Sequence, residues 1–122
     1  MSEEPVVPVD LRDLAREDFC YLTTTGRVTG KPHTIEIWFG LNGRTLYMLS
    51  GGRDSSDWVK NIRRRPQVIV RIGEVSFGGL GRVVDDPEED ALARRLLVGK
   101  YRSGSRDLTN WGRTALPVAV DV

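Results

Sequence analysis

A glycine-rich basic turn between two predicted strands is the segment best suited to hold an anion. Gly26 lets the backbone come close to a ligand, because a residue without a side chain leaves that space open. Arg27 and Lys31 add cationic donors, and Thr34 adds a hydroxyl where the next strand begins. The pattern predicts a phosphate-binding turn, and the alternative is a basic hairpin turn without a ligand.

A second candidate segment is Ser50-Gly51-Gly52-Arg53, which leads within a few residues into a predicted helix. Its backbone N–H groups and the N-terminus of that helix suit a planar or anionic ligand. The alternative is a flexible connection without a ligand. The spacing is not that of a P-loop, since no Gly-Lys-Ser/Thr follows, and the chain contains no GxGxxG motif.

Metal and nucleophilic chemistry are both disfavoured by the histidine and cysteine content. The chain has one histidine, His33, and one cysteine, Cys20, which is too few for a cluster of metal ligands or an intramolecular disulfide. No nucleophile-elbow motif accompanies them. His33 alternates with Ile35 and Ile37, so we expect it at the end of a core-facing row rather than in acid–base catalysis.

Strands dominate the expected secondary structure, and short connections join them. Asn42-Gly43 is a strong hairpin signal, Asp86 with Pro87 and Glu89 is a helix start, and Pro66 ends the helix before it. The predicted strands are 19–25, 33–39, 45–49, 68–72, 75–84 and 116–120, and the predicted helices are 11–17, capped by Asp10, 54–65 and one that begins at residue 87.

These elements predict a mainly β protein, a split or closed antiparallel barrel of about six strands. At 122 residues the chain is expected to form a single domain over 1–122, with a loose segment at 1–9. The glycines of the 75–84 strand indicate a bulge or a close backbone approach, and Pro117 places the last strand near an edge or at a strand start.

Charge and hydropathy bear on partners and location. The net charge is +1, which argues against a nucleic-acid-binding protein. One cluster of basic residues keeps nucleic-acid binding as a minor alternative, and it predicts an affinity that falls steeply with salt concentration. The residues of this cluster are Lys60, Arg63, Arg64, Arg65 and Arg71. No apolar run approaches the ~20 residues of a membrane span, and no signal-peptide pattern is present, so we expect a cytoplasmic protein.

Several motifs together resemble the deazaflavin-dependent nitroreductase family. They are Leu22-Thr23-Thr24-Thr25-Gly26-Arg27, the Gly-Lys-Pro turn, Ser50-Gly51-Gly52, and Asp57-Trp58-Val59-Lys60-Asn61-Ile62 followed by Pro66-Gln67-Val68. That family belongs with the split-barrel flavin-binding proteins related to pyridoxamine phosphate oxidase. The similarity covers roughly residues 19–73 and extends loosely to the last strand.

The resemblance implies a cofactor, a reaction and a set of contacts. The cofactor is coenzyme F420, with FMN as the alternative, and reduced cofactor passes a hydride to a small quinone, nitro or enone acceptor without covalent catalysis by a side chain. By position, Arg27, Lys31, Pro32 and Thr34 lie near the phosphate and tail, Ser50, Gly51, Gly52 and Arg53 contact the ring, and Trp58 and Asn61 secure the bordering helix. A homodimer is also implied, with Glu36, Trp38 and the glycine-rich strand as the expected interface.

The chain departs from the family pattern at two places. Nitroreductase members place tyrosines before the last strand, whereas this chain offers Tyr101 and Trp111, which together with Trp38 are the candidates for the substrate pocket. Residues 51–56 lack the family's lysine and add Asp54, which weakens the case for a tight anionic site. A non-catalytic protein that binds a cofactor or another ligand is therefore the alternative function.

Overall fold

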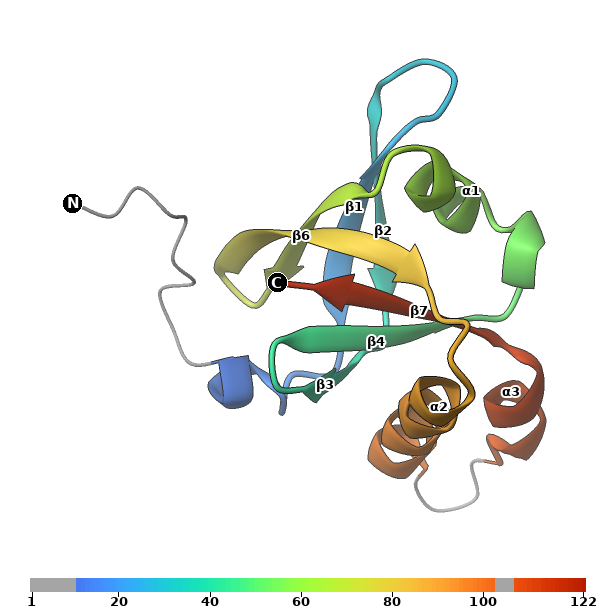
Figure 1. Ribbon diagram of the computed structural model, residues 1–122. Helices are drawn as coiled ribbons and strands as arrows, with labels where there is room; N and C mark the ends of the chain where they lie inside the picture. Colours follow the sequence, from blue (N-terminus) through green and yellow to red (C-terminus); the bar gives the residue numbers. More distant parts are fainter. Residues whose placement is uncertain (1–10, 103–106) are drawn as a thin grey trace.

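The computed structural model describes residues 11–102 and 107–122, so the predicted loose segment 1–9 and Asp10, the predicted cap of the 11–17 helix, lie outside the described residues. Seven strands form one antiparallel sheet in the order β2-β1-β5-β6-β7-β4-β3, and the sheet curls into a split barrel (Figure 1). The strands are β1 Cys20–Thr25, β2 Pro32–Ile37, β3 Gly40–Asn42, β4 Thr45–Ser50, β5 Gln67–Ile72, β6 Val75–Val83 and β7 Leu116–Asp121.

Three α-helices and two short 3₁₀ helices complete the described chain. They are α1 Asp57–Arg64, α2 Pro87–Tyr101, α3 Thr109–Thr114, η1 Leu11–Leu14 and η2 Arg53–Ser55. In Figure 1, α1 lies beside the projecting β1–β2 hairpin, whereas α2 and α3 lie together at the other end of the sheet, next to β4 and β7.

The strand count is seven rather than the six expected, because the predicted 33–39 strand ends early. Trp38 and Phe39 leave the ladder after Ile37, and the chain re-enters the sheet as β3, which pairs with β4 through Gly40 and Tyr47. Three residues are too few to show a period of two, so this strand gave no pattern in the sequence. The hairpin predicted at Asn42-Gly43 is confirmed, but its turn residues are Gly43 and Arg44, because Asn42 pairs with Thr45 as the last residue of β3. Gly43 has a positive φ of 64°.

The interior of the barrel is one apolar core, and a second core lies under α2 and α3. Burial alternates along β1 and β5, as expected where one face of a strand meets the core. In contrast, β4 and β7 are buried on nearly every residue, because the barrel core lies on one side and α2 on the other. Pro117 therefore stands near the start of a central strand and not at an edge.

The glycine-rich strand β6 is explained by close approach. A Cβ on Gly79 would lie 2.7 Å from Val120 Cγ1, and a Cβ on Gly81 would lie 3.0 Å from Ile62 Cγ2. Both distances are below ordinary van der Waals contact. The glycines thus let β6 pack tightly against β7 on one side and α1 on the other, as the sequence predicted.

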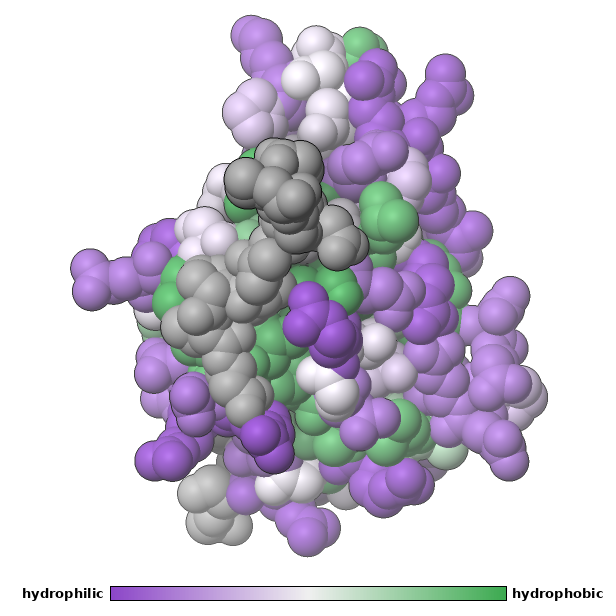
Figure 2. All heavy atoms as spheres, turned by 60° about the vertical axis from the view of Figure 1, so that its left-hand side comes forward, coloured by the Kyte–Doolittle hydropathy of each residue, from purple (hydrophilic) through white to green (hydrophobic). Residues whose placement is uncertain are grey.

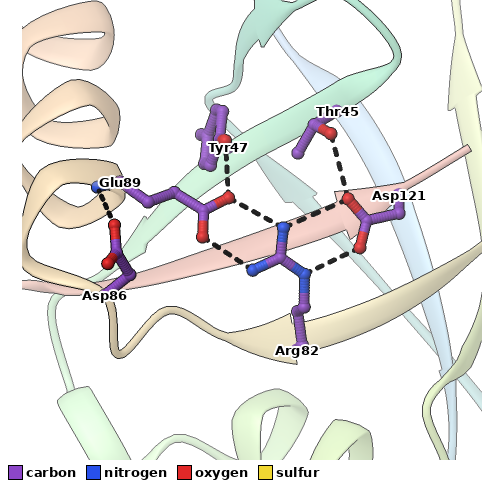
Figure 3. Close-up of polar contacts among 6 residues, drawn as sticks. All are labelled: Thr45, Tyr47, Arg82, Asp86, Glu89 and Asp121. Atoms are coloured by element: carbon purple, nitrogen blue, oxygen red, sulfur yellow. Dashed lines mark hydrogen bonds and ion pairs between the residues drawn. The ribbon is translucent and has the colours of Figure 1, made fainter.

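The start of α2 is capped as expected, but Glu89 has another role. The Asp86 carboxylate accepts a hydrogen bond from the Glu89 N–H at 2.9 Å, and Pro87 occupies the first turn. The Glu89 carboxylate does not reach back to the cap. It accepts two hydrogen bonds from the Arg82 guanidinium, at 2.7 and 2.8 Å, and one from the Tyr47 hydroxyl at 2.7 Å (Figure 3).

The Arg82 guanidinium joins four elements of the fold. Its other edge donates to Asp121 at 2.7 and 3.2 Å, and Thr45 donates to the same carboxylate at 2.9 Å (Figure 3). These bonds hold the pKa of Glu89 and of Asp121 below their ordinary values. Burial and the neighbouring Glu89 raise the pKa of Tyr47 to about 12, so its hydroxyl stays a donor at neutral pH. We call Thr45, Tyr47, Arg82, Glu89 and Asp121 the Arg82 network.

The surface is largely polar, with apolar side chains scattered through it. Figure 2 shows hydrophilic residues around the margin of one face and hydrophobic residues between them. The end that projects at the top of that view is the β1–β2 hairpin of Figure 1, and it carries mainly hydrophilic and intermediate residues. Within the described ranges, no helix has the length and apolar character that crossing a membrane requires.

Candidate functional site

A groove of about 640 Å³ lies between the β1–β2 hairpin and α1. The β1–β2 hairpin turn forms one wall of the groove, because these two strands extend beyond their neighbours in the sheet. The helix α1 forms the other wall and packs on β1 and β6. The lining residues of the groove are Thr24, Gly26, Arg27, Val28, Thr29, Pro32, His33, Thr34, Ile35, Asp57, Trp58 and Asn61. We call this cavity the hairpin groove.

Arg27 is fixed in the hairpin groove by contacts with α1. Its guanidinium donates to Asn61 Oδ1 at 2.8 Å, to the backbone oxygen of Asp57 at 3.5 Å and to Asp57 Oδ1 at 3.2 Å. An arginine has five N–H donors, so the Nε–H and one Nη2–H have no acceptor among the described residues. The side chain is 32% exposed, which leaves those donors within reach of an anion.

Asn61 is the residue that ties the hairpin to the helix. Its side chain is buried, and it donates to Thr24 Oγ1 at 3.1 Å while it accepts from both the backbone N–H and the guanidinium of Arg27. A buried amide with all these partners costs little, whereas loss of the partners would leave it unsatisfied. Asn61 therefore sets the position of Arg27, in line with its predicted role in securing the bordering helix.

His33 stands where the core-facing row of β2 opens into the groove. It pairs with Thr24 across the β1–β2 ladder, and the next residues of the same row, Ile35 and Ile37, pack against the barrel core. A Cβ on Gly26 would lie 2.9 Å from His33 Nε2, so the imidazole rests directly against the glycine backbone. His33 is at the end of the core-facing row, as predicted, but it is exposed rather than buried.

The Ser50–Arg53 segment does not line the hairpin groove. Ser50 is buried and bonds to the hydroxyl of Ser56 at 2.8 Å and to the backbone oxygen of Arg53 at 3.1 Å. Arg53 has a left-handed backbone, with φ of 53°, and its guanidinium donates to the backbone oxygen of Thr114. This segment thus orders the approach to α1, and Ser56 stands at the N-cap position, although its hydroxyl bonds to Ser50 instead of capping.

The predicted cofactor residues fall into two groups in space. Five of them line the hairpin groove: Arg27, Pro32, Thr34, Trp58 and Asn61. Lys31 belongs to the same turn without lining the cavity, and Ser50, Gly51, Gly52 and Arg53 lie at the connection before α1. The groove also includes Thr24, His33 and Asp57, which sequence reasoning did not select as ligand contacts. Asp57 and Asn61 are four residues apart on one face of the helix, and this spacing could have indicated that Asp57 also borders the site.

Two of the three predicted pocket aromatics line a second cavity, of about 370 Å³. Trp38 and Trp111 meet edge to face, with ring centroids 5.6 Å apart, and the other lining residues are Glu36, Ile37, Leu49 and Leu108. We call this cavity the tryptophan pocket. Ile35 lines the hairpin groove, and Glu36 and Ile37 line the tryptophan pocket, so neighbouring residues of β2 border the two cavities.

Tyr101 supports the tryptophan pocket from behind. Its ring is buried and stacks on Trp38 at 4.2 Å between centroids. Its hydroxyl accepts from the Phe39 N–H at 3.0 Å and lies 2.7 Å from the backbone oxygen of Asp18, to which it donates. Burial raises the pKa of this hydroxyl to about 12. Tyr101 therefore provides a hydrogen-bond partner for the backbone N–H of Phe39, where the chain leaves the sheet between β2 and β3.

We expect Tyr101→Phe to lower the free energy of unfolding by about 2 kcal/mol, because it leaves the buried backbone N–H of Phe39 without its partner and removes a part-buried hydrogen bond to the Asp18 oxygen. Urea denaturation measures this. Tyr21→Phe is the matched control, since the Tyr21 hydroxyl makes only an exposed 3.3 Å bond to Glu36 and its loss should cost less than about 0.5 kcal/mol. Equal losses in the two variants would contradict the assignment.

Metal and thiol chemistry find no site in the described residues. No group of three or more His, Cys, Asp or Glu side chains there is placed to hold a metal ion. Cys20 is buried in the barrel core, and burial raises the pKa of its thiol to about 12. The ammonium of Lys100 nearby donates to the Phe39 backbone oxygen at 3.0 Å and lies over the Phe39 ring, and burial lowers its pKa.

Solved structures with the same fold include F420-linked proteins. One described as an F420-H2-dependent reductase has a TM-score of 0.67 and 21% identity, with 85% of this chain and 94% of that chain covered. Another, described as a domain-swapped dimer, has a TM-score of 0.68 and 23% identity, with 85% of this chain and 80% of that chain covered. These similarities confirm the predicted split barrel.

Sequence comparison is more specific. A curated F420H(2)-dependent quinone reductase of Mycobacterium tuberculosis is 29% identical over 104 residues, which cover 83% of this chain and 69% of that protein. The sequence model of the F420H(2)-dependent quinone reductase family matches residues 8–122. The match spans both cavities and every described strand, and it confirms the predicted link to deazaflavin-dependent split barrels. The chain belongs to the F420H(2)-dependent quinone reductase family.

Proposed function

We propose that this protein is an oxidoreductase that holds reduced coenzyme F420 along the hairpin groove and delivers a hydride to a small quinone, with nitro compounds and enones as further acceptors. The observation that carries the proposal is Arg27, which α1 holds in the groove while two of its N–H donors have no acceptor among the residues that the structure describes. Family membership supplies the identity of the cofactor.

The residues of the groove fit an anionic, partly aromatic ligand. Arg27 offers charge-assisted hydrogen bonds, and Thr29 and Thr34 also line the groove, although the Thr34 hydroxyl is hydrogen-bonded to that of Thr23 at 2.7 Å. Trp58 and Ile35 give an apolar side against which a flat ring can pack. Lys31 adds an exposed ammonium in the same turn. Asp57 lowers the positive charge, yet it also fixes Arg27 in place.

Catalysis in this scheme rests on positioning. Bound F420H2 supplies the hydride, and the chain supplies the geometry and the electrostatic environment. Reduction of a quinone to a hydroquinone takes one hydride and one proton, and the proton is available from water because both cavities are open to solvent. No side chain is required to form a covalent bond.

We assign the acceptor to the tryptophan pocket. Five of its six lining residues are apolar or aromatic, and two indoles at right angles form a slot that suits a flat ring. Ile37, which lines the tryptophan pocket, is two residues along β2 from Ile35, which lines the groove. An acceptor in the pocket is therefore close to a cofactor ring held at the Ile35 end of the groove. Tyr101 holds Trp38 in position.

We expect Trp111→Ala to raise the KM for a naphthoquinone at least tenfold with a smaller effect on kcat, because the loss removes apolar contact made equally in the ground and transition states. Steady-state kinetics with F420H2 measure this. Phe19→Ala is the control, since Phe19 is a partly exposed aromatic that lines neither cavity. A KM and kcat within about twofold of wild type would instead place Trp111 outside the acceptor site.

The test of the function itself is a pair of titrations, with F420 and with FMN, followed by an acceptor screen. Saturable binding of F420 at micromolar concentration, weaker binding of FMN and oxidation of F420H2 by a benzoquinone or naphthoquinone are the expected results. If F420 binds but no acceptor oxidises it, the protein binds the cofactor without turnover. If F420 does not bind, the proposal fails.

We further propose that two copies associate through the outer face of β5 and β6. Ile69 and Leu80 are apolar and more than half exposed there, at 55% and 53%, and Gly78 opposite Ile69 leaves the face flat. The family resemblance likewise implies a homodimer, and of the interface expected from the sequence this proposal keeps the glycine-rich strand, β6, but not Glu36 and Trp38. Sedimentation equilibrium should give twice the mass of 13.7 kDa, and a single-copy mass at micromolar concentration would refute the dimer.

A further inference from the structure

The net charge of the hairpin groove depends on one side chain. Its twelve lining residues include one permanent cation, Arg27, one carboxylate, Asp57, and one imidazole, His33. Arg27 and Asp57 form an ion pair at 3.2 Å and cancel each other in the field felt by a distant anion. With a neutral imidazole the wall carries no net charge, and with an imidazolium it carries one positive charge.

The surroundings of His33 leave it available for a ligand. Opposite it on β1 is Thr24, which does not ionise, and α1 presents Asp57, Trp58 and Asn61 to the same cavity. Lys31 is in the adjoining turn and Lys60 is exposed on α1, and neither lines the cavity. Glu36 lies on the other face of β2, where it accepts from Tyr21. Among the described residues no hydrogen bond or ion pair engages the imidazole.

The imidazole is nevertheless held in a defined place. Gly26 leaves the space into which Nε2 fits, and the Gly26 backbone is itself fixed by a 2.7 Å hydrogen bond from its N–H to the Lys31 oxygen and by a 2.9 Å bond from the Gly30 N–H to its own oxygen. The ring therefore rests against a hydrogen-bonded part of the turn, next to Arg27 in the sequence.

We propose that His33 is an additional ligand-binding residue, which contacts an anionic group of the bound cofactor in its imidazolium form, so that the protein takes up a proton when it binds. This inference rests on the proposed F420 function. Histidine is the side chain that changes charge between about pH 5 and pH 8, so the affinity of the groove falls as the pH rises through that range. A single charge at close range changes the Kd by about tenfold.

Calorimetry on the intact protein tests the inference. F420 is titrated into wild type, His33→Gln and His33→Lys at pH 5.5 and at pH 8.0, each in two buffers of different ionisation enthalpy, which gives the Kd and the protons taken up. F420 has an ionisable ring hydroxyl of its own, so the difference between wild type and His33→Gln isolates the contribution of the protein. His33→Lys keeps the positive charge at both pH values.

The expected result is a wild-type Kd that weakens about tenfold more than that of His33→Gln between pH 5.5 and pH 8.0, with extra proton uptake that is absent in His33→Gln. His33→Lys should keep the tighter affinity at pH 8.0. Parallel pH dependences and equal proton uptake in wild type and His33→Gln would overturn the inference while leaving F420 binding intact. No binding in any variant at either pH would overturn the proposed function and this inference together.

A spectroscopic readout is independent of turnover. His33 is the one histidine in the chain, so its ring proton gives an unambiguous NMR titration curve. The curve should move to higher pH when F420 is bound, because an anion stabilises the imidazolium. An unchanged curve in the complex would show that no anionic group lies near the ring and would overturn the inference.

Discussion

Arg27→Glu is expected to raise the Kd for F420 at least a hundredfold, and Arg27→Gln about tenfold. The glutamate replaces two free N–H donors in the groove with a carboxylate that repels an anionic ligand and stands beside Asp57. Truncation of one partner in a buried charged contact typically costs about 2–5 kcal/mol, or roughly 30-fold to several thousandfold in Kd, and the partial exposure of Arg27 places Arg27→Gln below this range. Fluorescence titration measures the effect.

Arg63→Glu is the matched control for this experiment. Arg63 also forms a 3.2 Å ion pair with an aspartate, Asp54, but it lies outside the hairpin groove. The control should bind F420 within about twofold of wild type. If both variants lose affinity equally, the effect is one of overall charge, and Arg27 is not a direct ligand. Circular dichroism of Arg27→Glu verifies that α1 stays folded without the tether.

The Arg82 network gives the largest expected effect on stability. We expect Arg82→Met to lower the free energy of unfolding by about 2 kcal/mol, because two carboxylates and Tyr47 lose their shared partner and the carboxylates then face each other. Arg82 and Asp121 are each more than two-fifths exposed, so solvent screens part of the loss. Urea denaturation at pH 7 measures the difference.

The pH dependence of this difference has a definite sign. Arg82 lowers the folded-state pKa of Glu89 and of Asp121, so the stabilisation is present above their unfolded values and is lost as the pH falls through about 4 and below. The gap between wild type and Arg82→Met should therefore shrink in acid. Arg63→Met, which breaks a single exposed pair, should cost less than about 1 kcal/mol at every pH. A gap that stays constant down to pH 3 would contradict the electrostatic origin.

Local sequence signals predicted those parts of the fold that local chemistry decides. Asn42-Gly43 gave the hairpin, Asp86-Pro87 gave the start of α2, and Pro66 gave the end of α1, because each acts on its immediate neighbours. The predicted helix over 54–65 is divided into η2 and α1, since Arg53 takes a left-handed conformation and Ser56 bonds back to Ser50. The split barrel, predicted from strand periods and the family resemblance, is confirmed.

The features that sequence reasoning missed depend on contacts between distant residues. Glu89 fits a capping box by spacing, yet the Arg82 guanidinium provides two charge-assisted bonds, which are stronger than a bond to a neutral cap N–H. The α3 helix is six residues long and has no strong start signal, so its sequence alone does not define it. Arg27 was correctly singled out as a cation, but its tether to α1 joins residues 34 positions apart.

The position of β7 in the sheet determines how this protein can be synthesised. This strand follows all the other described strands in the sequence, yet it lies between β6 and β4 and pairs with both. Until it has been synthesised, the β3–β4 hairpin has no partner in the sheet, and β6 presents an open edge. Such edges recruit strands from other nascent chains. We therefore expect the barrel to form only once β7 is available to pair, and chains stalled before residue 116 to depend on chaperones.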